Sequence, residues 1–491
     1  MAKTLAGADE TASAHLTTTR GAALYIGALL GPGLLLLPGL AAAEAGPASV
    51  LAWAGLLVLS GLFAVVFGAL GRGFGSAGGV IGYVRAGLGA RASAVAGWSF
   101  LAGVVGGAPV VCLIGAGYVT ALTGGGPLAR AAIAALLLAA VLTLAAGGLR
   151  TSATAQLLLV ALLAAVVIVA VAGSAHSLRA ANWTPFAPHG WPAVGHAAST
   201  LMLSFVGWEA AAPLTTRFAD PGRQLPRVIG AALAVTSLLY LGLAVATTGV
   251  LGAGAGTSAP LAALLRDAAG PAGTAAAAVA AVVLTLGAVN AYVTGAAEMA
   301  AELARPRAAR PGAGLGPVPR VPAPRISVPR VPAPRFLAAI AVSGLAVISL
   351  YGAGWASPAA LVALPTSLFL LVYLGCMVSA ARVLRGPARW AAVPAGVIVA
   401  VVLCYCGWAL FAPLSVILAV SCSAFCSARL RRARARTARR TTGGTAGRAA
   451  ENTAGCAGGR TESQGAPEQG DTSADSRGHL ECQTPGVAYG A

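Results

Sequence analysis

Charged residues are scarce in this chain: they make up 9% of its 491 residues, whereas 57% are hydrophobic. The mean hydropathy is +0.81. So few charges cannot cover a water-soluble protein of this length, and the composition excludes that class. Apolar runs of about 20 residues, each able to cross roughly 30 Å of hydrocarbon, recur from Gly21 to Cys426. We therefore expect an all-α integral membrane protein with about twelve transmembrane helices.

Side chains that perform catalysis or hold metal ions are also few. The eight cysteines and five histidines do not have the spacing of a metal site or a disulfide framework. The apolar segments contain no paired carboxylates and no nucleophile beside a base. We therefore expect no enzyme activity, no metal site and no cofactor.

Negative charge is the scarcer sign, and the formal net charge is +18. If the N-terminus is cytoplasmic, every Lys and Arg except Arg130, Arg179 and Arg266 falls in a cytoplasmic segment. This bias predicts that both termini are cytoplasmic and that the number of crossings is even. Topology and contact with anionic lipid then account for the positive charge without nucleic-acid binding. The expected location is the cell (plasma) membrane.

Changes in composition divide the chain into three parts. We expect a cytoplasmic tail at residues 1–20, a transmembrane domain at 21–427 and a second cytoplasmic tail at 428–491. Within the transmembrane domain, residues 305–335 form a Pro/Arg-rich loop in which VPRVPAPR occurs twice; its prolines favour extended polyproline II. The second tail starts with RLRRARARTARR and continues as polar sequence of the kind that stays disordered.

The stretch from Tyr25 to Glu44 is apolar enough to cross a bilayer, yet it has Gly31, Pro32 and Gly33 at its middle. Proline lacks an amide hydrogen, and glycine tolerates open backbone conformations. In hydrocarbon, a backbone group without a partner costs several kcal/mol unless protein or a water-filled cavity receives it. Taken alone, this stretch fits a packed proline kink and a binding site equally well.

A second interruption lies in the stretch from Leu201 to Ala212, LMLSFVGWEAAA. It places Ser204, Gly207 and Glu209 about ten residues inside an apolar span, where polar groups are costly. Broken helices at corresponding places in two halves of a chain are typical of inverted-repeat transporters, whose substrates bind at the breaks. The pair of interruptions therefore favours a binding site over a kink.

Several stretches resemble the amino acid-polyamine-organocation (APC) transporter superfamily, and within it bacterial exporters of methionine and branched-chain amino acids. They are LLGPGLLLLPG, LGRGFGSAGGV, FVGWEAAAPLTTRFADPGRQLPRVI and YLGCMVSAARVLRG. The similarity covers roughly residues 20–427 and leaves out the Pro/Arg-rich loop and the second tail. It implies a LeuT-like core, which is a five-plus-five inverted repeat with discontinuous helices 1 and 6, followed by two further helices.

The resemblance also implies how an amino acid binds. It places the substrate carboxylate at the first break, at Gly31, Pro32 and Gly33, although Pro32 replaces a small hydroxyl residue common in relatives. It places the ammonium group at backbone carbonyls of the second break, which are those of Leu203, Ser204, Phe205, Val206 and Gly207. Electrostatics agrees, because half-helix N-termini favour anions and half-helix C-termini favour cations.

Two side chains bear on the substrate and its coupling ion. The resemblance aligns Asn290 with a substrate-facing position; since it carries no charge, a neutral amino acid fits best. A charged Glu209 near the bilayer centre costs roughly 2.5 to 3.5 kcal/mol, which proton uptake avoids. We therefore hypothesise that Glu209 couples opposite movements of proton and substrate. The alternative is a permanently protonated side chain that only bonds nearby backbone.

These observations predict a secondary active exporter of neutral amino acids that works by alternating access and proton antiport. The alternative is an importer or exchanger of amino acids or polyamines from the same superfamily, because a carrier runs down whichever gradient is larger. The particular amino acid, sodium as the coupling ion and the oligomeric state are left open.

Overall fold

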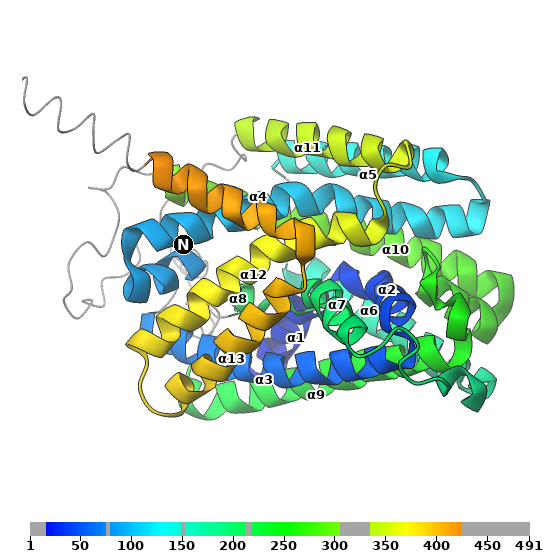
Figure 1. Ribbon diagram of the computed structural model, residues 1–491, viewed down its shortest axis with the longest axis horizontal. Coiled ribbons are helices and arrows are strands. Elements are labelled where there is room, and N and C mark those ends of the chain that lie inside the picture. Colours follow the sequence, from blue (N-terminus) through cyan, green and yellow to red (C-terminus); the bar gives the residue numbers. More distant parts are fainter. Residues whose placement is uncertain (1–15, 75–78, 149–152, 212–217, 305–333, 424–491) are drawn as a thin grey trace, which may run out of the picture. The chain divides into compact units, whose positions relative to one another are not determined.

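The computed structural model describes residues 16–74, 79–148, 153–211, 218–304 and 334–423. Within these ranges every regular element is a helix, apart from an isolated bridge between Leu16 and Phe218. Residues 305–333 of the expected loop and the whole expected tail at 428–491 lie outside them. The α-helices (Figure 1) are α1 (Thr18–Leu29), α2 (Leu37–Ala45), α3 (Ser49–Phe74), α4 (Gly79–Thr123), α5 (Pro127–Ala146), α6 (Ala153–Gly173), α7 (Pro192–Leu201), α8 (Trp208–Ala211), α9 (Pro221–Ala246), α10 (Pro260–Ala304), α11 (Pro334–Gly352), α12 (Pro358–Val383) and α13 (Pro387–Cys404).

The helices account for the expected crossings. In the described part of the chain, nine helical segments are long and apolar enough to span a membrane. One of the nine, Leu37–Phe74, contains both α2 and α3; α3 alone is long enough for that crossing, and α2 joins α1 in another. The remaining crossings come from α7 with α8 and from the shorter apolar helix Gly407–Ser423. The two paired crossings are the ones interrupted where the sequence predicts breaks. The prediction of an all-α membrane protein with twelve helices and discontinuous helices 1 and 6 is confirmed.

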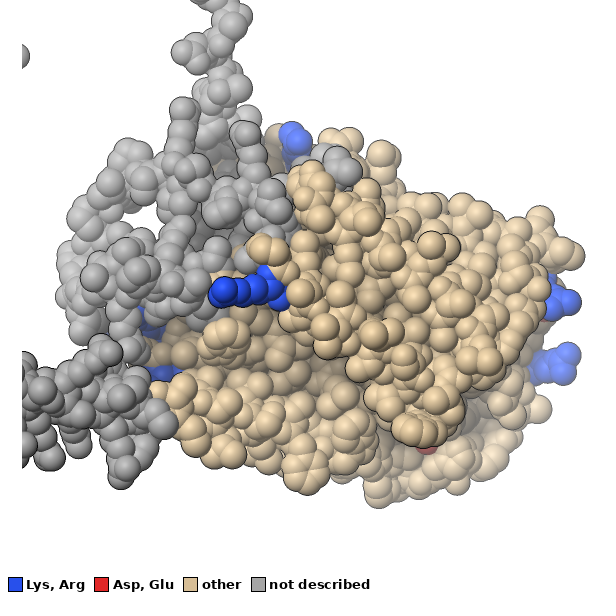
Figure 2. Space-filling view, turned by 90° about the horizontal axis from the view of Figure 1, so that it is seen from above, with Lys and Arg blue, Asp and Glu red and all other residues tan. Residues whose placement is uncertain are grey.

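The outer surface of the described residues is largely apolar. Leu128 and Leu238 are each 75% exposed, and many other leucines and valines also point outward. Figure 2 shows a broad tan face, with Lys and Arg side chains towards the left and along the right-hand edge. Such a surface suits contact with hydrocarbon, because isolated large apolar patches of this extent are rare on soluble monomers.

The broken helices lie in the middle of the helix assembly. In Figure 1, α1, α2, α7 and α8 lie between α3 and α9 on one side and α4 and α10 on the other. Residue contacts join α1 to α9, α2 to α7, and α4 to both α10 and α12. Both interruptions are therefore surrounded by other long helices, which can supply partners to the freed backbone groups.

Glycines allow α4 to approach its neighbours closely. A Cβ placed on Gly115 would lie 2.5 Å from Thr285 Oγ1 of α10, and one on Gly103 would lie 3.1 Å from the Phe369 ring of α12. Small residues at such crossings are how membrane helices gain van der Waals contact. These contacts therefore set how closely α4 lies to α10 and α12.

We expect Gly115→Ala to destabilise the protein by about 1 to 3 kcal/mol, because the added methyl group pushes α4 away from α10. The measurement is the thermal unfolding midpoint of the purified protein in detergent. Gly106→Ala is the matched control on the same helix, since nothing lies within 4 Å of its Cβ position. Equal midpoints for the two variants would contradict this account of the packing.

Candidate functional site

The first break opens the backbone between α1 and α2. The α1 helix ends at Leu29, Gly31 is extended with φ −93° and ψ 168°, and Pro32–Leu35 form a short 3-10 helix, η1. The first hydrogen bond of η1 runs from the Leu34 amide to the Gly31 carbonyl, at 3.3 Å. The Gly33 amide therefore has no acceptor within η1, as is usual at the start of a helix. This break presents an open amide at a helix N-terminus, which favours an anion.

The second break has a different geometry. The α7 helix ends at Leu201, and Met202–Phe205 form a 3-10 helix, η5. Val206 is extended, with ψ 127°, and Gly207 has φ 152° before α8 begins at Trp208. The last carbonyl groups of η5 have no following helical turn to bond them, so they favour a donor or a cation.

The two breaks lie against each other. A Cβ on Gly207 would overlap the Ala28 carbonyl at the end of α1, and one on Gly33 would lie 3.0 Å from Ser204 Oγ. The Tyr240 hydroxyl on α9 lies 2.6 Å from the Leu29 carbonyl oxygen and 2.9 Å from that of Ser204. A single donor thus joins the end of α1 to η5.

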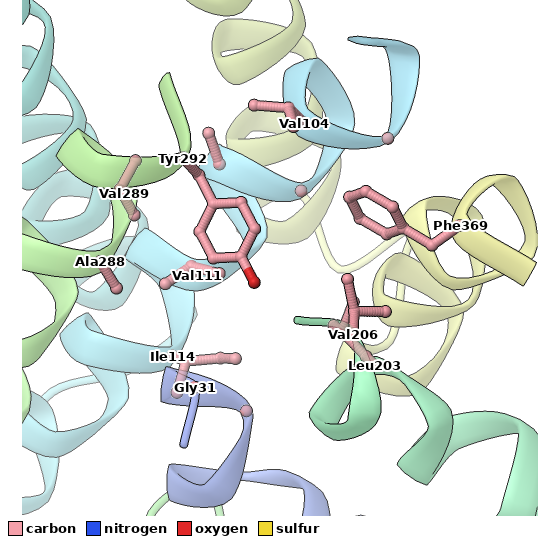
Figure 3. A pocket seen from close by; sticks show the side chains of 14 residues that line it. Gly31, Val104, Val111, Ile114, Leu203, Val206, Ala288, Val289, Tyr292 and Phe369 are labelled. Carbon is pink, nitrogen blue, oxygen red and sulfur yellow. The ribbon is translucent and has the colours of Figure 1, made fainter. Parts of the chain in front are cut away.

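A central cavity lies beside these breaks, with about 610 Å³ of empty space, part of which is open to solvent. Its walls come from both breaks and from α4, α10 and α12, and nearly all of them are apolar. In Figure 3, the Tyr292 hydroxyl points into the middle of the space. The lining residues are Gly31, Gly33, Gly103, Val104, Gly107, Ala108, Val111, Ile114, Leu203, Val206, Ala288, Val289, Tyr292 and Phe369.

The structure separates the predicted substrate residues into two groups. Gly31, Gly33, Leu203 and Val206 line the cavity, and Pro32 links the two glycines along the chain. The remaining predicted residues are buried but are not among the lining residues: Ser204, Phe205, Gly207 and Asn290.

The residues outside the lining have other contacts. The Phe205 ring packs against Trp53 and Tyr240, with ring centroids 5.9 and 5.3 Å apart. Asn290 follows the lining residues Ala288 and Val289 on α10, and its carbonyl accepts a hydrogen bond from Thr294 at 2.9 Å. Phe205 and Asn290 therefore belong to the support of the cavity in this conformation.

Glu209 is 6% exposed and lies behind the second break, outside the cavity lining. Its Oε2 accepts hydrogen bonds from the Gly207 amide, at 2.9 Å, and from the Tyr373 hydroxyl of α12. The Tyr373 oxygen also accepts from the Gly207 and Trp208 amides, at 3.0 and 3.2 Å. The carboxyl group thus holds the backbone of the break in place.

Sequence reasoning did not select several lining residues, of which Tyr292 and Phe369 are the largest. A usable signal was the i, i+4 pair Gly103 and Gly107, which leaves a groove along one face of α4. Tyr292 lies four residues after Ala288 and so shares its helix face. In the described part of the chain, no group of three or more His, Cys, Asp or Glu residues could hold a metal ion.

Comparisons with known proteins agree with this architecture. Residues 16–310 match the amino acid permease family. The uncharacterised amino acid permease YecA of Bacillus subtilis (strain 168) is 32% identical over 401 residues, 81% of this chain and 92% of that protein. The L-methionine/branched-chain amino acid exporter YjeH of Escherichia coli (strain K12) is 29% identical over 238 residues, 47% of this chain and 55% of that protein.

A solved structure shares the fold. The crystal structure of MhsT in complex with L-phenylalanine superimposes with a TM-score of 0.53 at 14% sequence identity, covering 83% of this chain and 99% of MhsT. Similarity at this level of identity concerns the fold alone. It confirms the predicted LeuT-like core.

We expect Gly207→Ala to destabilise the protein by roughly 1 to 3 kcal/mol, because its φ of 152° suits glycine and an added Cβ overlaps the Ala28 carbonyl. Gly31→Ala is the matched control: its φ of −93° suits any residue, and no atom lies within 4 Å of its Cβ position. Thermal midpoints in detergent check both variants. A Gly207→Ala protein as stable as Gly31→Ala would show that the two breaks do not need this close contact.

Proposed function

The chain belongs to the amino acid permease family, within the APC superfamily, and from that premise we propose that it is a secondary active transporter of neutral, apolar amino acids that works by alternating access. The observation that carries the proposal is the central cavity, which joins two backbone breaks to apolar walls. An amino acid needs this combination, because its charged head group requires polar backbone while an apolar side chain gains from burial.

The head group binds at the breaks in this proposal. The open Gly33 amide, at the start of η1, receives the carboxylate together with the positive end of that half-helix. The ammonium group binds at carbonyls at the end of η5, close to Leu203 and Val206. The Leu29 and Ser204 carbonyls already accept from Tyr240, and the Phe205 carbonyl accepts from Tyr373, so the Leu203 and Val206 carbonyls are the acceptors that we propose.

The side chain of the substrate occupies the remainder of the cavity. Val111, Ile114 and Phe369 form apolar walls there, and no charged side chain of the described residues lines the space. Burying a cationic or anionic side chain without a partner costs several kcal/mol, so charged amino acids are excluded. The ligand named for MhsT, L-phenylalanine, and the substrates named for YjeH are of the same neutral, apolar class.

Proton antiport through Glu209, with export as the direction, completes the proposal. An ionised Glu209 accepts from both the Gly207 amide and the Tyr373 hydroxyl, whereas a protonated carboxyl group is a weaker acceptor. Proton uptake therefore loosens the second break, and proton release tightens it. Import or exchange of amino acids or polyamines is the alternative, since the same carrier runs in either direction.

The proposed orientation puts both termini in the cytoplasm, with the arginines of that side near anionic lipid. The uneven distribution of Lys and Arg along the sequence supports it. The Pro/Arg-rich loop and the second tail are accessory in this proposal, so deletion of residues 428–491 spares transport.

We expect Val111→Phe to reduce the exchange of labelled leucine across proteoliposomes at least about tenfold, and the exchange of alanine by less, because the larger ring fills space needed by the leucine side chain. Val58→Phe makes the same change at an outward position that is 67% exposed, and it should leave both rates unchanged. A parallel loss for leucine and alanine would argue against a side-chain pocket at Val111.

We expect Glu209→Gln to exchange leucine at a rate that no longer depends on pH and no longer responds to an imposed proton gradient, because the amide cannot release a proton. Glu44→Gln is the control, because it makes the same change at another acidic side chain. Glu44 lies near the end of α2 and accepts a hydrogen bond from Thr200 at 3.0 Å. If Glu209→Gln keeps the wild-type pH dependence while leucine exchange persists, proton coupling through Glu209 is wrong but amino-acid transport stands.

A further inference from the structure

Arg130 is a buried cation outside the site described above. It lies in the first turn of α5 and is 5% exposed. Its Nε donates to the Leu113 carbonyl at 2.9 Å, and its Nη1 donates to the Tyr351 hydroxyl at 3.1 Å. The guanidinium carbon also lies 5.1 Å from the centre of the Tyr351 ring. These partners are neutral, so they orient the guanidinium group without cancelling its charge.

The charge of Arg130 is uncompensated within the described residues. No Asp or Glu among them lies within salt-bridge distance of its guanidinium group. Arginine stays protonated in proteins and has five N–H donors, of which Leu113 and Tyr351 take two. Since an isolated charge away from water costs several kcal/mol or more, this position favours an anionic partner.

The guanidinium group borders a small cavity of its own. The empty space is about 210 Å³, part of it open to solvent, and apart from Arg130 and Tyr351 its walls are apolar. Leu36 of the first break lines it, and Ile114 lines both this cavity and the central one. The space suits one small ion or a single carboxylate group.

Two helix N-termini add to the positive potential at this cavity. Arg130 itself lies at the start of α5, where a cation is opposed by the helix dipole and an anion is favoured. The α12 helix begins at Pro358, which is also part of the cavity wall. The Arg130 side chain and the first residue of α12 therefore border the same space.

Gly117 of α4 makes room for this arrangement. A Cβ on Gly117 would lie 2.9 Å from both Cζ and Nη2 of Arg130, so the guanidinium group lies against the bare backbone of α4. One turn away from the cavity, the Tyr118 hydroxyl donates to the Leu35 carbonyl of η1. The same short segment of α4 thus holds both Arg130 and the first break.

We propose that Arg130 and Tyr351 bind one small monovalent anion in this cavity, beside the first break and separate from the substrate site. Charge-assisted hydrogen bonds from the remaining N–H groups of the guanidinium hold it, and the N-terminus of α12 strengthens the attraction. A halide ion satisfies this chemistry, and so does the carboxylate of an amino acid passing between the cavities.

The test is equilibrium binding of radiolabelled chloride to the purified full-length protein, in sodium gluconate at constant ionic strength. We expect saturable binding of about one ion per chain, and at least about tenfold weaker binding for Arg130→Met. Arg266→Met removes a charge from an exposed arginine and serves as the matched control, with unchanged binding. Tyr351→Phe keeps the ring but loses the hydroxyl that orients Arg130, so we expect weaker binding than in the wild type.

Competition separates the two sources of the anion. Displacement of chloride by leucine, but not by leucinamide, assigns the site to a substrate carboxylate; no displacement by either assigns it to a halide. If Arg130→Met does not fold, the thermal midpoint of the wild-type protein decides, since chloride or formate should raise it saturably relative to gluconate. Equal chloride binding by wild type and Arg130→Met, or no effect of either anion on the wild type, overturns the proposal. Neither result bears on leucine exchange, so the proposed transport function is tested separately.

Discussion

A helix that is interrupted inside a bilayer must find new partners for the backbone groups that the interruption frees, because hydrocarbon offers none. In this protein three tyrosine hydroxyls supply them. Tyr118 donates to the Leu35 carbonyl, Tyr240 lies between the Leu29 and Ser204 carbonyls, and Tyr373 accepts from the Gly207 amide. Each is buried and lies within a regular stretch of a long helix, so the long helices stabilise the interrupted ones.

This requirement explains why the cavity can be apolar and still lie beside polar backbone. The tyrosines bond backbone groups that the two breaks free, and Ser60 receives the Trp208 indole N–H at 2.9 Å. Gly33, Leu203 and Val206 line the cavity, and no tyrosine hydroxyl in the described part of the chain is bonded to their backbone groups. In the proposed function a zwitterionic head group binds these backbone groups, and the apolar walls select the side chain.

Much of the fold could be predicted from the sequence, because its signals are local. Apolar runs set the crossings, and Gly31, Pro32, Gly33 and Gly207 mark the breaks through the conformational properties of proline and glycine.

The lining of the cavity could not be predicted in the same way. The membrane helices are apolar on every side, so periodicity does not reveal which face of α4, α10 or α12 points inward. Tyr292 and Phe369 enter the cavity, while Asn290 does not line it, because of how these helices are rotated and packed. The hydrogen bond between Glu209 and Tyr373 joins residues 164 positions apart in the chain, and no short-range pattern predicts it.

The position of Tyr240 has a consequence for how α1 and η5 can separate. Its hydroxyl has one hydrogen but two acceptors within reach, the Leu29 and Ser204 carbonyl oxygens. In the proposed transport cycle, when α1 and η5 move apart, that hydrogen can stay with whichever partner remains near α9. The Tyr240 hydroxyl then keeps one acceptor throughout the movement.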